Sequence, residues 1–147
     1  MSPNTTVTAP AGTATTTREV IEGFWEAHST GNREQLKKFI SPEIAWTVVG
    51  RTVPLAKTYT GWQGFFDELL AALDASFKPE TLVMERSATH VDEQSGVAVL
   101  ELFESAVTND GKAFQNHIVD VLQVKDGLIV AAREYMDLAE VKDAFGF

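Results

Sequence analysis

The sequence contains no cysteine and few basic residues. Without cysteine the chain cannot form disulfides, thiolate zinc sites or iron–sulfur clusters, and it has no cysteine nucleophile. The 12 Lys and Arg residues are outnumbered by 21 Asp and Glu residues, for a formal net charge of -9. Because a nucleic-acid-binding protein needs an excess of basic side chains to neutralise phosphates, we expect no nucleic-acid partner. The lack of cysteine also fits a cytoplasmic location.

Long apolar runs are missing as well. No run of about 18 apolar residues is present to span a membrane, and no basic segment followed by an apolar core marks a secretory signal. We therefore expect no membrane partner. Residues 1–17 are nearly all small or polar, so we predict a disordered tail that buries too little apolar surface to offset the entropy of ordering. Residues 18–147 have the length and apolar content of a single domain.

Amphipathic helices are predicted in the first half of this domain, where apolar residues recur every three or four positions. Their expected ranges are 18–30, 33–39 and 62–77. The second helix is expected to end at Ser41-Pro42, because a residue before proline disfavours helical torsion angles. A short β-rich run at 44–49 follows this break.

The second half is predicted to be mainly sheet. Its strand-length segments cover 81–91, 97–107, 113–125 and 128–137, and a short closing helix covers 138–145. The Asp126-Gly127 pair favours a tight hairpin turn between the last two strands. Helices followed by a meander of long strands are typical of an α+β fold, in which the helices cover one face of a curved, mainly antiparallel sheet.

Polar residues interrupt the apolar pattern of the last two predicted strands. A two-faced hairpin cannot place all of them in solvent, and a buried polar group needs a partner or a purpose. The sequence therefore predicts a pocket in this part of the domain. The residues concerned are Asn116, His117, Asp120, Arg133, Glu134 and Asp137.

Four segments carry a resemblance to a known family: the Phe24-Trp25 pair, 41–46, 54–61 and 124–137. Together they resemble the nuclear transport factor 2-like superfamily, in particular its SnoaL-like polyketide cyclases, ketosteroid isomerase relatives and limonene epoxide hydrolases. The resemblance implies a cone-shaped α+β barrel whose wide mouth admits a hydrophobic small molecule. It also implies a homodimer that pairs through the outer face of the sheet.

Glu134 is the first candidate for a catalytic group. It shares a strand face with Ala132 and Met136, and the resemblance puts this face toward the pocket, where the epoxide hydrolases have one of two catalytic aspartates. A carboxyl group among apolar walls has a raised pKa, which suits a general acid or base near neutral pH. The alternative is a structural ion pair with a neighbouring basic side chain.

Glu101 is the expected partner of Glu134. It shares a strand face with Phe103, and the resemblance places these two residues where the epoxide hydrolases have an arginine and the second catalytic aspartate. Because two members of that Asp-Arg-Asp set are missing, epoxide hydrolysis is the less favoured reaction.

Asn116 and His117 lie on opposite faces of one predicted strand, so at most one should face the pocket unless a bulge intervenes. Similarity to the epoxide hydrolases favours Asn116, whereas similarity to the ketosteroid isomerases fits His117 equally well. Asn116 could bond a carbonyl or enolate oxygen, and His117 could move a proton. Asp120 is a weaker candidate, and Asp137 is expected to cap the closing helix.

An apolar wall is expected around these groups, although each of its members also fits an ordinary core. The expected members are Trp46, Phe65, Leu69, Phe103, Ile118 and Met136. The three histidines have no metal-ligand spacing, and no glycine-rich phosphate loop is present, so neither a metal nor a cofactor is expected.

Two kinds of function remain. The first is cofactor-independent proton transfer on a hydrophobic carbonyl compound, as an isomerase, cyclase or dehydratase, with Glu134 as acid or base. The alternative is a domain of the same fold that binds a small molecule or a partner without catalysis. The titration of Glu134 distinguishes them, because an unperturbed carboxyl group would weaken the enzyme interpretation.

Overall fold

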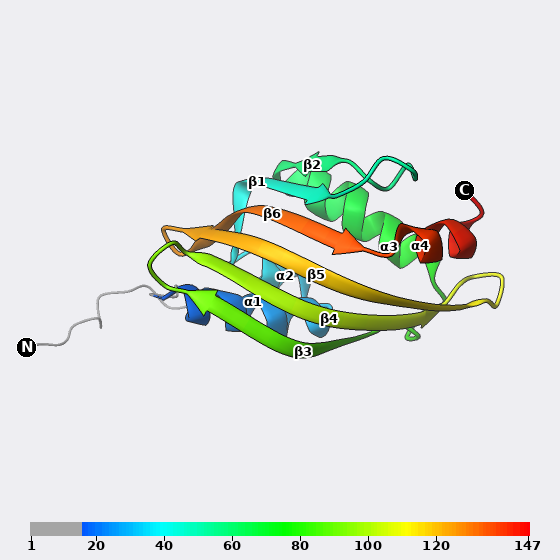
Figure 1. Cartoon of the computed structure of the whole chain (residues 1–147), viewed down its shortest axis with the longest axis horizontal. Coiled ribbons are helices and arrows are strands. Elements are labelled where there is room, and N and C mark those ends of the chain that lie inside the picture. Colours follow the sequence, from blue (N-terminus) through cyan, green and yellow to red (C-terminus); the bar gives the residue numbers. More distant parts are fainter. Residues whose placement is uncertain (1–15) are drawn as a thin grey trace, which may run out of the picture.

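The computed structural model describes residues 16–147 and has an α+β fold, in which a curved six-stranded sheet carries helices on its concave side (Figure 1). Most of the predicted tail lies outside the described residues. Thr16 and Thr17, its last two positions, instead start the first helix. The Thr16 hydroxyl accepts the Glu19 N–H at 3.1 Å, and the Glu19 carboxylate accepts the Thr16 N–H at 2.9 Å. This reciprocal capping box fixes the helix start.

The helices follow the predicted order. They are α1 (Thr17–Ser29), α2 (Arg33–Leu36), η2 (Gln63–Leu70), α3 (Ala71–Ser76) and α4 (Leu138–Phe145). The apolar face predicted for the first helix is buried, with Val20, Ile21 and Phe24 fully inaccessible. The third predicted helix is continuous but changes type, because η2 is a π-helix and α3 is α-helical.

The sheet contains six strands in the spatial order β2-β1-β6-β5-β4-β3. All neighbours are antiparallel except β1 and β6, which are parallel. The strands β2 and β3 remain edges and do not pair with each other, so the predicted barrel is an open curved sheet. The strands are β1 (Ile40–Val48), β2 (Thr58–Thr60), β3 (Val83–Asp92), β4 (Val97–Val107), β5 (Ala113–Lys125) and β6 (Leu128–Met136).

The largest differences from the predicted elements lie near Pro42. The strand β1 begins at Ile40 and runs through Pro42, and the helix before it ends at Leu36. Pairing of β1 with β6 shifts register between Ile40 and Ala45, so Pro42 lies at an irregularity where no ladder N–H is needed. The short strand β2 was not predicted, since it occupies only three residues of a segment interpreted as a loop.

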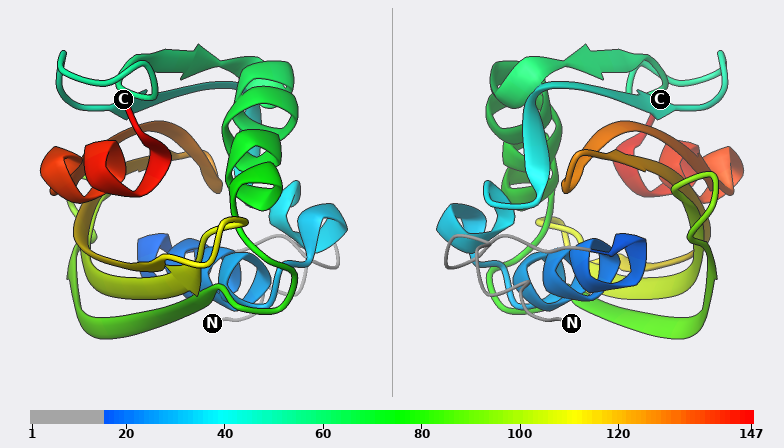
Figure 2. Two further views of the ribbon diagram at one scale, coloured as in Figure 1. Left: turned by 90° about the vertical axis from the view of Figure 1, so that its right-hand side faces the viewer. Right: turned by 90° about the vertical axis from the view of Figure 1, so that its left-hand side faces the viewer.

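The hairpin turn was predicted correctly, because Asp126 and Gly127 have φ angles of 53° and 78°. Seen end-on, the sheet curls around α1, η2 and α3, while α4 lies across one end (Figure 2). The main core fills the space between the sheet and these helices, with Trp46, Phe24 and Phe65 its largest fully buried side chains. No helix within residues 16–147 is long and apolar enough to cross a membrane.

Candidate functional site

A cavity of about 50 Å³ lies inside the concave face of the sheet. It has room for a few water molecules, since one water needs roughly 10–15 Å³ measured in this way. Most of its wall is apolar, and its polar side chains come from β1, β4, β6 and α1. The lining residues are His28, Trp46, Leu55, Phe65, Leu69, Leu70, Leu73, Phe77, Glu104, Phe114, Ile118, Glu134, Met136, Val141 and Phe145.

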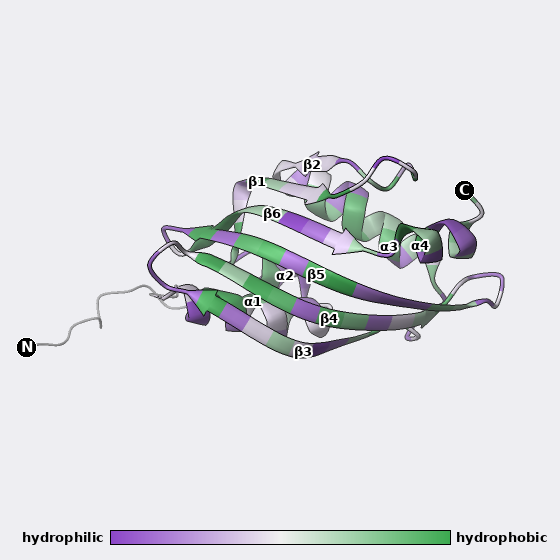
Figure 3. Cartoon of the chain, viewed as in Figure 1, coloured by the Kyte–Doolittle hydropathy of each residue, from purple (hydrophilic) through white to green (hydrophobic). Residues whose placement is uncertain are grey.

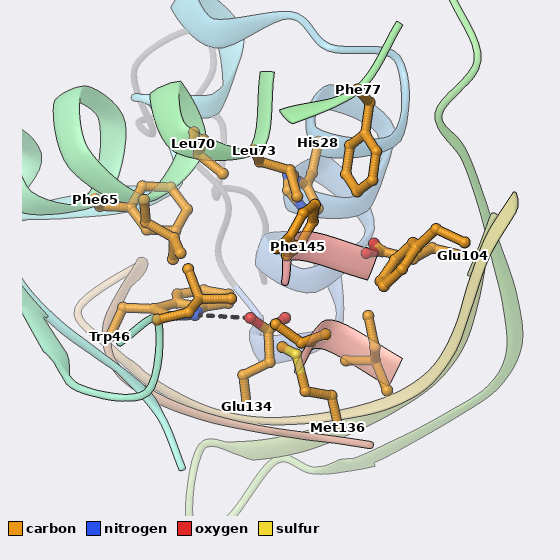
Figure 4. A pocket seen from close by; sticks show the side chains of 15 residues that line it. His28, Trp46, Phe65, Leu70, Leu73, Phe77, Glu104, Glu134, Met136 and Phe145 are labelled. Atoms are coloured by element: carbon orange, nitrogen blue, oxygen red, sulfur yellow. Dashed lines mark hydrogen bonds between the residues drawn. The ribbon is translucent and has the colours of Figure 1, made fainter. Parts of the chain in front are cut away.

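Glu134 enters the cavity from β6. The parallel pairing of β1 with β6 sets Trp46 opposite Ala132, and the Trp46 Nε1–H donates to Glu134 Oε1 at 3.3 Å (Figure 4). Burial raises the pKa of Glu134, while interactions with Asp120 and with the Trp46 N–H oppose this rise. The indole therefore favours a negative charge on Glu134.

Asp120 lies on β5, where it pairs with Glu134 of the neighbouring strand β6. Its side chain is fully buried, and no N–H or O–H group among the described residues donates to either oxygen. Burial raises the pKa of Asp120 well above its ordinary value, and the neighbouring Glu134 carboxylate raises it further. Because only Glu134 receives a donor, we place the proton of this pair on Asp120 and the charge on Glu134.

Glu104 is the third carboxyl group on this face of the sheet. It enters from β4, is only 8% exposed, and has no hydrogen-bond partner or ion pair among the described residues. Burial raises the pKa of Glu104 to about 8, with a further contribution from Glu134. The group is therefore mostly protonated at neutral pH, and it can donate a hydrogen bond into the cavity.

His28 faces the carboxyl groups from α1 on the opposite wall (Figure 4). Its ring stacks on Phe24 with centroids 5.2 Å apart, and its Nδ1 has no hydrogen-bond partner among residues 16–147. Burial, followed by the nearby Arg33 charge, lowers the pKa of His28 to about 4. The imidazole is therefore neutral at physiological pH.

Comparison with known proteins gives no match to a family model and none to a curated protein. Solved structures do match. An NTF2-like protein from Burkholderia thailandensis has a TM-score of 0.78 at 20% identity, over 89% of this chain and 98% of that one. An NTF2-like protein of unknown function from Burkholderia pseudomallei has a TM-score of 0.77 at 13% identity, over 91% and 100%. The chain has the NTF2-like fold.

Some proteins with the NTF2-like fold are provisionally described as isomerases. One from Rhodopseudomonas palustris has a TM-score of 0.68 at 16% identity, over 87% of this chain and 97% of that one. At such identities the similarity shows a shared fold only. The reaction of this chain therefore has to be inferred from the residues of its own cavity.

Glu101 and Phe103 do not lie in the cavity of this NTF2-like domain. Glu101 is exposed on the outer face of the sheet, with Oε2 2.8 Å from Nε2 of His90. Phe103 lies on the same outer face, against the ring of His117. Their predicted common face is correct, but it is the wrong face of the sheet. The inward positions of β4 hold Leu100, Leu102 and Glu104, so Glu104 takes the place expected for Glu101.

The orientation left open by the sequence is resolved in favour of Asn116. Asn116 is buried on the inner face, whereas His117 is exposed on the outer face. The Asn116 amide is occupied, because its Oδ1 accepts the Asp137 N–H at 3.0 Å and its Nδ2 donates to the Asp137 carbonyl at 3.3 Å. Asn116 therefore joins β5 to the start of α4 and does not line the cavity.

Five of the six expected apolar wall residues line the cavity, namely Trp46, Phe65, Leu69, Ile118 and Met136. Asp137 caps α4 as predicted, since its Oδ1 accepts the Ala139 N–H at 3.0 Å. In the described part of the chain, no group of three or more His, Asp or Glu side chains is arranged to hold a metal ion.

Proposed function

We propose that this protein catalyses cofactor-independent proton transfer on a hydrophobic carbonyl compound, as an isomerase, cyclase or dehydratase. The observation that carries this proposal is that one apolar cavity holds two carboxyl groups of which only one accepts a hydrogen bond. Glu134 accepts an indole N–H, which favours its charged form, and Glu104 has no donor, which favours its neutral form.

Glu134 is the base in this mechanism. Its carboxylate removes a proton from the carbon next to the substrate carbonyl, and Asp120 stays protonated beside it. The negative charge moves to the carbonyl oxygen as the C–H bond breaks. Protonated Glu104 donates a hydrogen bond to that oxygen and stabilises the enolate. Return of the proton from Glu134 to another carbon completes an isomerisation.

The cavity walls suit a hydrophobic substrate, and the cavity of about 50 Å³ has to widen to admit a cyclic ketone. Trp46 and Phe65 lie with ring centroids 4.8 Å apart at one end, and Phe77, Phe114 and Phe145 contact one another at the other end. Aromatic surfaces of this kind exclude water, which strengthens every hydrogen bond to the developing charge. The provisional isomerases among proteins of this fold are consistent with this chemistry.

The direct test is exchange of carbon-bound hydrogen in deuterated water. A panel of cyclic and aromatic ketones is incubated with the protein, and deuterium incorporation next to the carbonyl is followed by NMR. We expect the protein to catalyse exchange for at least one ketone. Glu134→Gln should reduce this rate about 10²- to 10⁴-fold, because the amide cannot accept the proton.

Glu85→Gln is the matched control, since it makes the same chemical change at an exposed position of β3. It should leave the exchange rate unchanged. Activity should also fall as the pH rises past about 8, where Glu104 loses its proton. Exchange that persists in Glu134→Gln would show that Glu134 is not the base, and absence of exchange with every ketone would favour the non-catalytic alternative.

A further inference from the structure

The polar part of the cavity is acidic, and its lining residues include no lysine or arginine. Glu104 and Glu134 both face the interior, from β4 and β6 on either side of β5, and Asp120 lies next to Glu134. None of the three carboxyl groups forms an ion pair with a basic side chain among residues 16–147. The fold therefore gathers acidic groups here and supplies no positive charge to balance them.

Several polar atoms at this site also lack hydrogen-bond partners. Glu104 is more than nine-tenths buried, faces the cavity and receives no hydrogen bond within the described residues. His28 is similarly buried, and its Nδ1 has no partner there. A buried polar group without a hydrogen-bond partner destabilises the fold. A ligand that forms a hydrogen bond to such an atom removes this cost, and the free energy recovered adds to its affinity.

The aromatic walls favour a ligand with positive charge. Trp46 contacts Glu134 and packs against Phe65, and Phe77, Phe114 and Phe145 also line the cavity. The faces of aromatic rings attract cations, most strongly where water is excluded. Acidic groups surrounded by aromatic rings form the complement of an alkylammonium ion.

We propose that this cavity widens to bind compact hydrophobic amines in their protonated form, with the ammonium group between Glu134 and Glu104 and the hydrocarbon part against the aromatic walls. Widening is required, because the empty cavity of about 50 Å³ holds only a few water molecules. Binding of an amine goes beyond the proposed proton transfer. A neutral carbonyl compound uses Glu104 as a hydrogen-bond donor, whereas an ammonium ion uses it as a counter-ion. An amine in the cavity therefore excludes a carbonyl substrate.

Amine binding has a pH dependence of defined sign. The titratable groups that face Glu104 are His28 from α1, Asp120 from β5 and Glu134 from β6, and the lining residues of η2 and α4 are apolar. The bound cation favours the charged form of Glu104, so binding near pH 7 releases a proton. Affinity should rise with pH up to about 8, the pKa of Glu104 in the empty cavity.

The test is titration calorimetry of the full chain with benzylamine and with benzyl alcohol, which has nearly the same shape but no charge. Repeating each titration in two buffers of different ionisation enthalpy counts the protons released. At pH 7.5 we expect benzylamine to bind at least about tenfold more tightly than benzyl alcohol. The ammonium group forms a charge-assisted hydrogen bond with a carboxylate, whereas the hydroxyl group of the alcohol forms a weaker neutral one. Only benzylamine should release protons.

Glu104→Gln should abolish the proton release and weaken benzylamine binding about tenfold, while benzyl alcohol binding stays the same. Glu85→Gln, at an exposed position, should match the unmodified protein. Equal affinities for the two probes, no proton release, or no benzylamine binding up to its solubility limit would each overturn the proposal. A melting temperature of Glu104→Gln that is no lower than that of the unmodified protein ensures that its lost affinity is not a folding defect.

The exchange assay separates this proposal from the proposed function. If benzylamine binds with proton release and no ketone exchanges its hydrogen, amine binding stands and proton-transfer catalysis fails. If ketones exchange and benzylamine neither binds nor inhibits the exchange, catalysis stands and amine binding fails.

Discussion

At the scale of single residues, the charge of each carboxyl group in the site depends on whether it accepts a hydrogen bond. Glu134 receives the Trp46 N–H, and Asp120 and Glu104 receive no N–H or O–H from the described residues. Three acidic groups on one buried face thus differ in charge because one of them has a donor and the others do not. A tryptophan expected only as part of the apolar wall determines which carboxyl group is charged.

The raised pKa values predict a stability that falls as the pH rises. A carboxyl group whose pKa is higher in the folded state than in the unfolded chain stabilises the fold fully below the unfolded value. This stabilisation is lost as the pH rises through the folded value. For Glu104 the window runs from 4.5 to about 8. We therefore expect the free energy of unfolding, measured by urea denaturation, to decrease across this window.

Glu104→Gln tests this expectation, because the amide is neutral at every pH. The variant should have a flatter pH dependence of the free energy of unfolding, by up to roughly 1.4 kcal/mol for each pKa unit removed. Asp120 and Glu134 should maintain part of the slope, since their pKa values are also raised. A slope identical to that of the unmodified protein would mean that Glu104 titrates normally.

At the scale of elements, close contact between α1 and the segment after α2 depends on a glycine. A Cβ atom built on Gly23 would lie 2.3 Å from ring carbons of Phe39, too close for any real contact. Alanine normally stabilises a helix interior relative to glycine by about 1 kcal/mol. Here we expect the clash with Phe39 to reverse the sign of this effect.

We expect Gly23→Ala to lower the free energy of unfolding by about 1–3 kcal/mol, the usual cost of overpacking, as measured by chemical denaturation. The double variant Gly23→Ala with Phe39→Leu should recover part of this loss, because the smaller side chain leaves room for the methyl group. An increase in stability for Gly23→Ala alone would contradict the packing seen here.

At the scale of the whole molecule, the outer face of the sheet is the surface we propose for pairing two subunits. Apolar and polar residues alternate along β4 and β5 (Figure 3), and Val119 and Tyr135 are 37% and 42% exposed. The Arg133 Nε–H donates to the Tyr135 hydroxyl at 3.2 Å on the same face. Exposed apolar groups beside polar ones suit an interface between copies of this chain.

Arg133→Glu tests this surface. Charge reversal should shift the mass measured by light scattering from dimer to monomer, because two symmetry-related copies would bring the new carboxylates to one interface. Lys125→Glu, which reverses a charge at the end of β5, is the matched control and should keep the dimer. A mass that does not change in Arg133→Glu would exclude this face.

The sequence by itself determined the kinds of element, their order, the Asp126-Gly127 turn and the grouping of Glu134 with Ala132 and Met136 on one strand face. Each depends on local spacing, such as alternation along a strand or φ angles that favour glycine and aspartate. The same alternation paired Glu101 with Phe103 correctly. It could not show which face of the strand is buried, since both faces carry apolar residues.

Only the tertiary structure decided which carboxyl groups meet. Counting back from Lys125 opposite Leu128 would set Val119 against Glu134, but a register shift between Gln123 and Val124 brings Asp120 there instead. No local pattern marks this irregularity. In the sequence, His28 belongs to the apolar face of a helix. Only the packing of α1 against the concave face of the sheet places its ring in the cavity. Strand register and the packing of helices on the sheet join residues that are far apart in the sequence, so local patterns could not predict the site.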